Sequence, residues 1–112
     1  MKNIDELEFL LGAQIEEISF VADYVELKNE FGIIRLLGFT ELTVAGCQIA
    51  DGDDQFEHEI RKLIGATLTC FQFVEDEVVQ VLLSNNVIAK STSKGFEIMH
   101  FVYSKTGQVL VW

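Results

Sequence analysis

The sequence predicts an α+β domain built mainly from one antiparallel sheet, curled or closed into a partial barrel, and two observations carry this prediction. Stretches with alternating apolar and polar residues, which are typical of half-buried strands, follow two apolar segments with helical spacing. The arrangement also occurs twice along the chain, with Gly12 of the first copy aligned on Gly65 of the second. Each copy is therefore expected to be a short helix followed by a β-meander.

The two copies are ELEFLLGAQIEEISFVADYV at 6–25 and EIRKLIGATLTCFQFVEDEV at 59–78. Most apolar positions coincide, and with one extra residue the pairs Phe31-Gly32 and Asn85-Asn86 fall together as tight turns. TELTVAG is expected to add one further short strand. We expect a single domain, 1–112, with repeats at about 3–39 and 55–91 and a C-terminal hairpin at 95–112.

The second helix has the clearer pattern. Its apolar stripe consists of Phe56, Ile60, Leu63 and Ile64. Asp53 or Asp54 is expected to cap its N-terminus, because the free N–H groups and the helix dipole favour carboxylates there. Glu57 and Arg61 are spaced as an i,i+4 ion pair, and Gly65 is expected to end the helix.

The charge balance narrows the classes of partner. The net charge is −10, and the excess acid lies in residues 1–84. Nucleic-acid binding through phosphates needs a basic face and is therefore disfavoured, whereas a basic protein would be attracted. No signal-peptide pattern and no membrane-length apolar run is present, so we expect a cytoplasmic protein without membrane contact. Cys47 and Cys70 are expected to be reduced, buried thiols.

The stretch ADGDDQFEHEI, residues 50–60, resembles a metal loop but fails the tests for one. An EF-hand starting at Asp51 would need glycine where Phe56 stands and glutamate where Lys62 stands. Asp54 and His58 share a helix face but lack third and fourth ligands for zinc. We therefore expect no metal and no cofactor, and we interpret the stretch as a capped helix start with an acidic surface.

No catalytic arrangement is predicted. Cys70, His100 and Glu97 are the residue types of a nucleophile, a base and an orienting acid. Cys70 nevertheless lies mid-strand, away from any helix N-terminus that would lower its pKa, which favours core packing. The chain contains neither a Walker loop nor a GxGxxG motif, and we do not expect an enzyme.

The repeated units, LLGAQI with DYVEL and LIGATL with DEVV, resemble a group of small bacterial proteins of unknown function. Some of that group look like immunity proteins of polymorphic toxin systems, and the chain also looks like products of mobile gene cassettes. The resemblance brings no catalytic residues. The acidic charge of residues 1–84, the small size and the missing chemical motif favour a non-enzymatic protein, immunity-like, that binds a basic protein partner through its acidic faces. The expected contact residues are Asp51, Asp53, Asp54, Glu57, Glu59, Glu75, Asp76 and Glu77.

Two other functions stay open at this point. A curled sheet rich in phenylalanine would be able to enclose an apolar cavity for a small molecule, although core packing of these rings is the commoner case. The phenylalanines concerned are Phe20, Phe39, Phe71, Phe73, Phe96 and Phe101. The third function is an uncommon hydrolase or metal enzyme.

Several predicted strands are apolar on both sides, among them GIIRLLGF, VVQVLL and FEIMHFVY. In a sheet with one solvent-exposed face, apolar and polar residues alternate along each strand. These strands do not alternate, so both faces of the sheet are expected to be covered. Two short helices are too small to cover a sheet face of this size, and a homodimer with two-fold symmetry is therefore expected. Trp112 is a candidate anchor of that interface, with ordinary core packing as the alternative.

Overall fold

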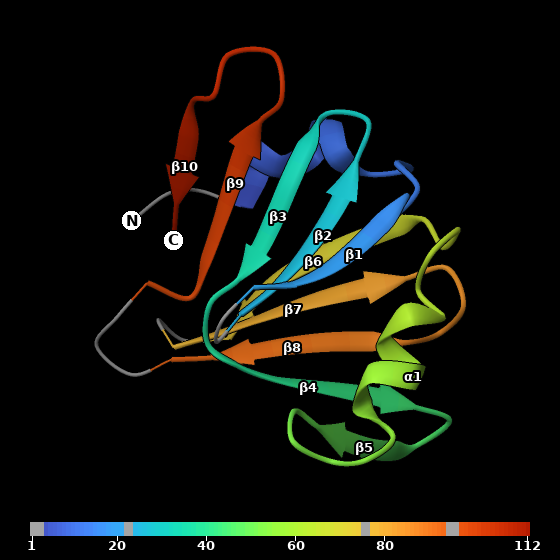
Figure 1. Cartoon of the computed structure of the whole chain (residues 1–112). Helices are drawn as coiled ribbons and strands as arrows, with labels where there is room; N and C mark the ends of the chain where they lie inside the picture. The colour runs from blue at the N-terminus through green and yellow to red at the C-terminus, as the bar shows by residue number, and fades with distance from the viewer. Residues whose placement is uncertain (1–3, 22–23, 75–76, 94–96) are drawn as a thin grey trace.

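A computed structural model describes residues 4–21, 24–74, 77–93 and 97–112 (Figure 1). The elements are the 3-10 helix η1 (Ile4–Leu10), β1 (Glu17–Val21), β2 (Tyr24–Asn29), β3 (Gly32–Leu36), β4 (Phe39–Val44), β5 (Cys47–Ala50), α1 (Phe56–Arg61), β6 (Leu68–Val74), β7 (Val78–Leu83), β8 (Ile88–Thr92), β9 (Met99–Tyr103) and β10 (Val109–Val111). No helix in these ranges is long and apolar enough to cross a membrane.

The strands form two five-stranded antiparallel sheets, ordered β1-β2-β3-β9-β10 and β5-β4-β8-β7-β6. The prediction of a mainly antiparallel sheet protein is confirmed. The prediction of one curled sheet or partial barrel is wrong, because the inner rows of two separate sheets share one core. Across the first sheet the central row is Ile18, Leu27, Ile34, Phe101 and Leu110, and across the second it is Phe71, Val81, Ala89, Leu42 and Ile49.

The predicted division into two helix-plus-meander repeats is also wrong. Each sheet combines three consecutive strands from one half of the chain with a hairpin from the other half. The hairpin β4–β5 of the first half pairs with β8, and the hairpin β9–β10 of the second half pairs with β3 (Figure 1). The segment expected to hold one short strand therefore contains two, which turn at Ala45 and Gly46.

The chain passes from one sheet to the other beside Gly38. The Leu37 N–H donates to the Ile98 carbonyl at 2.9 Å, which joins the two crossing segments. The Gly38 N–H donates to the buried Ser91 hydroxyl at 2.8 Å, and that hydroxyl donates to the Ile98 carbonyl at 3.2 Å. A Cβ at Gly38 would lie 2.3 Å from the Thr92 carbonyl oxygen, so any side chain there would force the backbone apart.

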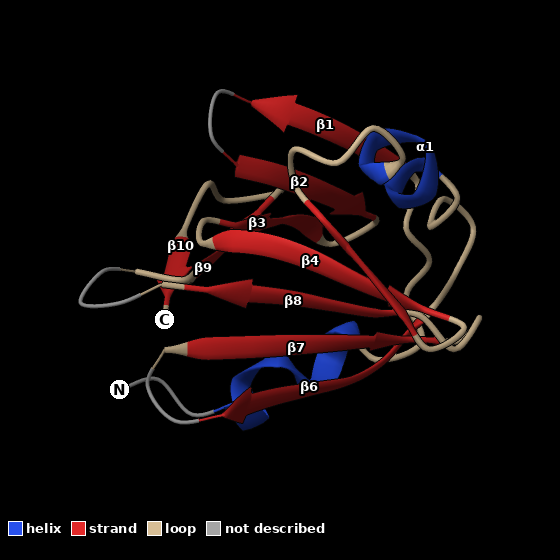
Figure 2. Ribbon diagram, turned by 90° about the horizontal axis from the view of Figure 1, so that it is seen from below, coloured by secondary structure: helices blue, strands red, loops and turns tan. Residues whose placement is uncertain are grey.

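The helices are shorter than the sequence predicts. η1 packs against β6, and α1 lies next to β4, with Phe56 of α1 edge to face on Phe20 of β1 (Figure 2). Gln55 occupies the N-cap position of α1 without a side-chain hydrogen bond, so the prediction of an aspartate cap is wrong. Gly12 and Gly65 follow the two helices with φ of 90° and 93°, as expected of helix-ending glycines. Ile64 is exposed and does not belong to the buried stripe.

Candidate functional site

The segments that follow the two helices meet in a short antiparallel pairing centred on Gln14 and Thr67. Its hydrogen bonds form two matching pairs, as a local two-fold arrangement requires. The N–H donors and carbonyl acceptors are Gly12 to Leu68 (2.8 Å), Gly65 to Ile15 (2.7 Å), Leu68 to Ala13 (2.9 Å) and Ile15 to Ala66 (2.9 Å). This pairing fixes the backbone on which a polar recess is built.

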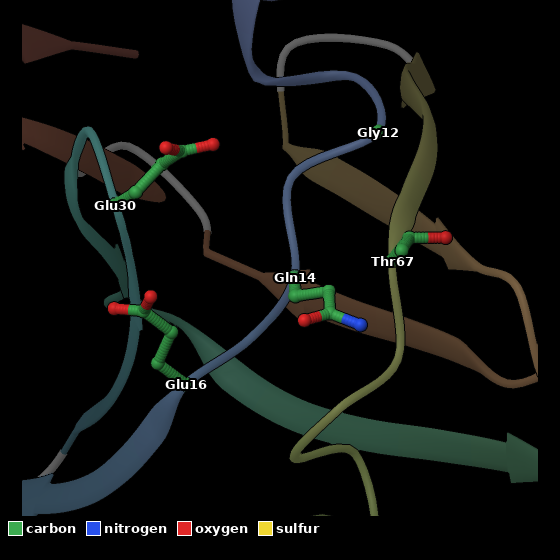
Figure 3. A pocket seen from close by; sticks show the side chains of 5 residues that line it. All are labelled: Gly12, Gln14, Glu16, Glu30 and Thr67. Carbon is green, nitrogen blue, oxygen red and sulfur yellow. The ribbon is translucent and has the colours of Figure 1, made fainter.

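The polar recess has a volume of about 410 Å³ and is lined by Gly12, Gln14, Glu16, Glu30 and Thr67. Figure 3 shows the carboxylates of Glu16 and Glu30 extending into the space between the β2–β3 turn and the segment before β1. Both side chains are exposed, and neither forms an ion pair with a cation of the described residues. Since no cation is among the described residues that line it, the recess favours a positively charged group.

A second recess of about 260 Å³ shares Glu30 with the first. Its aromatic walls are Phe9 from η1, Phe31 from the β2–β3 turn and Tyr103 from the end of β9. Ser104, Lys105 and Thr106 of the β9–β10 turn complete the lining. We call this the aromatic recess.

The rings of the aromatic recess are held by one another and by the core. Phe9 stacks on Tyr103 with ring centroids 5.6 Å apart and an interplanar angle of 8°, and it meets Phe31 edge to face at 5.6 Å. The fully buried Phe101 contacts Phe9 and Tyr103 edge to face at 5.5 and 4.9 Å. Phe9 and Phe31 nevertheless stay 38% and 39% exposed, so part of each ring is open to a ligand.

Hydrogen bonds fix the turn that carries Glu30 and Phe31. Asn29, only 2% exposed, accepts the Phe31 N–H through Oδ1 at 2.9 Å. The Ser104 N–H and hydroxyl both donate to the Phe31 carbonyl, at 3.0 and 3.2 Å. The β2–β3 turn is thereby joined to the β9–β10 turn, and the recess is formed before any ligand arrives.

The structure places the predicted acidic stretch elsewhere, in the turns after β5 and on α1. Asp53 accepts the Ala50 N–H at 2.8 Å, which makes it a turn residue. Glu57 pairs with Arg61 at 3.1 Å, as the spacing predicted, and Glu59 pairs with Lys62 at 3.0 Å. Asp51 and Asp54 are exposed.

Of the second predicted acidic group, Glu75 and Asp76 lie outside the described residues, and Glu77 is half-buried. Trp112 is also half-buried and stacks on Phe73 with ring centroids 6.3 Å apart, within the same chain. The binding role of the acidic residues and the interface role of Trp112 stay predictions.

The residues tested for catalysis lie apart. His100 of β9 pairs with Glu97, whereas Cys70 belongs to β6 in the other sheet. The prediction that both cysteines are buried is wrong for Cys47, which is exposed. In the described ranges, no three His, Cys, Asp or Glu residues are grouped so that they would hold a metal ion.

The phenylalanines expected around a cavity are dispersed. Phe71 and Phe101 lie in the core, whereas Phe20 and Phe39 are exposed. Phe73 is partly buried against Trp112, and Phe96 lies outside the described residues. The recesses described above use other aromatic residues.

Sequence reasoning missed both recesses. Their residues come from η1, the segment before β1, two hairpin turns and the approach to β6, with no common spacing. The one available signal was the repeat alignment, which places Gln14 opposite Thr67 at the same offset as Gly12 and Gly65. The alignment locates the Gln14–Thr67 pairing but not the carboxylates or rings beside it.

Comparison of the chain with protein-family models, curated proteins and solved structures gives no match. Nothing in these comparisons indicates catalysis.

Proposed function

We propose that the protein is a non-enzymatic interaction module, of the immunity type, that binds a basic protein through its acidic surface. The observation that carries the proposal is the polar recess, where Glu16 and Glu30 extend into one space with no cation among the described lining residues. The net charge of −10 supports it, because long-range attraction speeds the encounter with a basic partner.

The two acidic regions differ in how free their carboxylates are. On α1, Glu57 and Glu59 already pair with Arg61 and Lys62. Glu16 and Glu30 pair with no cation of the described ranges. A partner's cation would therefore meet less competition in the polar recess than on the helix. Within residues 51–59, the exposed Asp51 and Asp54 also form no ion pair with a cation of the described residues.

Two variants with the same loss of charge test the proposal. The double variants Glu16→Gln/Glu30→Gln and Asp51→Asn/Asp54→Asn are used as affinity baits in lysate of the source cell, beside the unaltered protein. We expect the unaltered protein to capture a basic protein in a salt-sensitive manner. The recess variant is expected to lose about ten-fold in affinity for the purified partner, and the loop variant less than three-fold, on the usual scale of charge-pair energies.

The control is folding, measured by circular dichroism, which neither substitution of exposed carboxylates is expected to change. Capture of no basic protein at low salt, or capture that both variants leave intact, contradicts the proposal.

A further inference from the structure

We propose that the aromatic recess is a receptor for one arginine side chain of the basic partner, with its guanidinium over the exposed rings and paired with Glu30. This inference rests on the proposed function and names the chemistry that the partner presents. It is argued from the rings, from the carboxylate that the two recesses share, and from Lys105, which lines the aromatic recess.

The rings suit a flat cation. Phe9 and Phe31 are each more than a third exposed, and their edge-to-face contact at an interplanar angle of 80° makes a corner with aromatic surface on two sides. A guanidinium is planar and weakly hydrated, so it stacks on such surfaces while its N–H groups remain free to donate. A lysine ammonium is compact and strongly hydrated, and it gains less from the same rings.

Glu30 supplies the charge. It lines both recesses and lies next to Phe31 in the β2–β3 turn, so a guanidinium against that ring is within reach of its carboxylate. A carboxylate accepts two parallel N–H donors from arginine, which adds direction to the attraction. Glu16, in the adjoining polar recess, is then available to a second basic residue of the same partner.

Lys105 is the one cation among the described residues that line the aromatic recess, and its charge opposes the proposed occupant. It lines the aromatic recess from the β9–β10 turn, is exposed, and forms no ion pair with an acid of the described residues. Its charge repels a bound guanidinium, so its removal is expected to tighten arginine binding. A recess that serves an anionic ligand would respond in the opposite direction, because Lys105 would then be its charge partner.

Two peptides of equal length, hexa-arginine and hexa-lysine, test the inference by calorimetry and by amide shift mapping. We expect hexa-arginine to bind the unaltered protein at least five-fold more tightly, with the largest shifts at residues 29–31 and 103–106. Phe31→Leu keeps the apolar contact but removes the ring, and it is expected to lower hexa-arginine affinity about five-fold. Lys105→Gln is expected to raise that affinity two- to three-fold.

Matched controls separate a local effect from a general one. Phe39→Leu alters a ring that is 53% exposed on β4, in the other sheet, and is expected to change neither affinity. Glu57→Gln removes one carboxylate on α1 and is expected to weaken both peptides equally and slightly. Phe9→Leu repeats the ring test from another element if Phe31→Leu lowers the thermal stability.

The outcomes distinguish the inference from the function on which it rests. Equal affinity for both peptides, unchanged by either ring substitution, overturns the arginine receptor while leaving a basic partner in place. Failure of the unaltered protein to bind either peptide or any basic protein overturns both proposals. Weaker binding of hexa-arginine by Lys105→Gln also overturns the receptor, since it assigns the recess to an anion.

Discussion

At the scale of single residues, the crossing between the sheets depends on one hydroxyl. Ser91 is fully buried and joins the Gly38 N–H to the Ile98 carbonyl. Its neighbours across the same row of the second sheet are Val79 and Thr40, both buried. The Ser91 hydroxyl is therefore the group that gives both the Gly38 N–H and the Ile98 carbonyl a hydrogen-bond partner.

Ser91→Ala is expected to lower the free energy of unfolding by about 1–3 kcal/mol, because it removes two hydrogen bonds, from the part-buried Gly38 N–H and to the Ile98 carbonyl, each worth about 0.5–1.5 kcal/mol. Urea unfolding followed by circular dichroism measures the change. Ser19→Ala, in β1 on the outer side of the first sheet, is the control and is expected to change stability by less than about 0.5 kcal/mol. Equal effects of the two substitutions would remove the special role of Ser91.

The residue scale also shows why the candidate site escaped prediction. Glu16 and Glu30 are two of many acids in the chain, and nothing in their spacing brings them together. Their proximity depends on the Gln14–Thr67 pairing and on the position of the β2–β3 turn, and both are set by tertiary structure. Glu57 and Arg61, in contrast, were predicted correctly because a helix places i,i+4 partners side by side.

At the scale of elements, prediction succeeded where periodicity is local. The turn at Asn86, with φ of 63°, and the hairpin of β9 and β10 follow from residue pattern and turn chemistry. The hairpin of β4 and β5 was missed because its turn carries Ala45 where asparagine or glycine would have signalled it. The aspartate cap of α1 failed because Asp53 already accepts the Ala50 N–H.

The β4–β5 turn offers an element-level test. Val44 pairs with Cys47, and the two residues between them have φ of 51° (Ala45) and 81° (Gly46), as in a type I′ turn. Ala45→Asn is expected to stabilise the protein by about 0.5–1 kcal/mol, since asparagine tolerates positive φ better than alanine. Thermal unfolding measures the gain, seen as a higher Tm.

The reverse substitution in the β7–β8 turn serves as the matched control. Asn86→Ala places alanine at φ of 63° and is expected to lower the Tm by a similar amount. A lower Tm for Ala45→Asn would show that the turn has a geometry other than type I′.

At the scale of the whole molecule, the two sheets are expected to unfold together. Trp112 continues the first sheet beyond β10, and its ring stacks on Phe73 of the second. Its fluorescence therefore reports the contact between sheets, whereas circular dichroism reports the strands. We expect the two signals to give coincident urea transitions, as in a two-state protein. Separate midpoints would mean that one sheet survives without the other.

The packing of the two sheets against each other also bears on the expected homodimer. Strands that are apolar on both sides were the reason to expect a second subunit. One face of each sheet is covered by the other sheet in the same chain, which accounts for part of that pattern. The outer surface still exposes Phe39 and Val74, and the dimer stays a prediction.

The exchange of hairpins between the halves has a consequence for synthesis. β3 is translated before every strand of the second sheet, whereas its neighbour β9 is translated only after all five of them. The nascent chain therefore holds Ile34 and Leu36 without their β9 partners, Phe101 and Met99, until the second sheet has been translated. Pairing of strands that are distant in the sequence slows folding, and it leaves apolar strand edges exposed to other chains in the meantime. Synthesis of β9 and β10, rather than completion of the first half of the chain, is the event that permits the native topology.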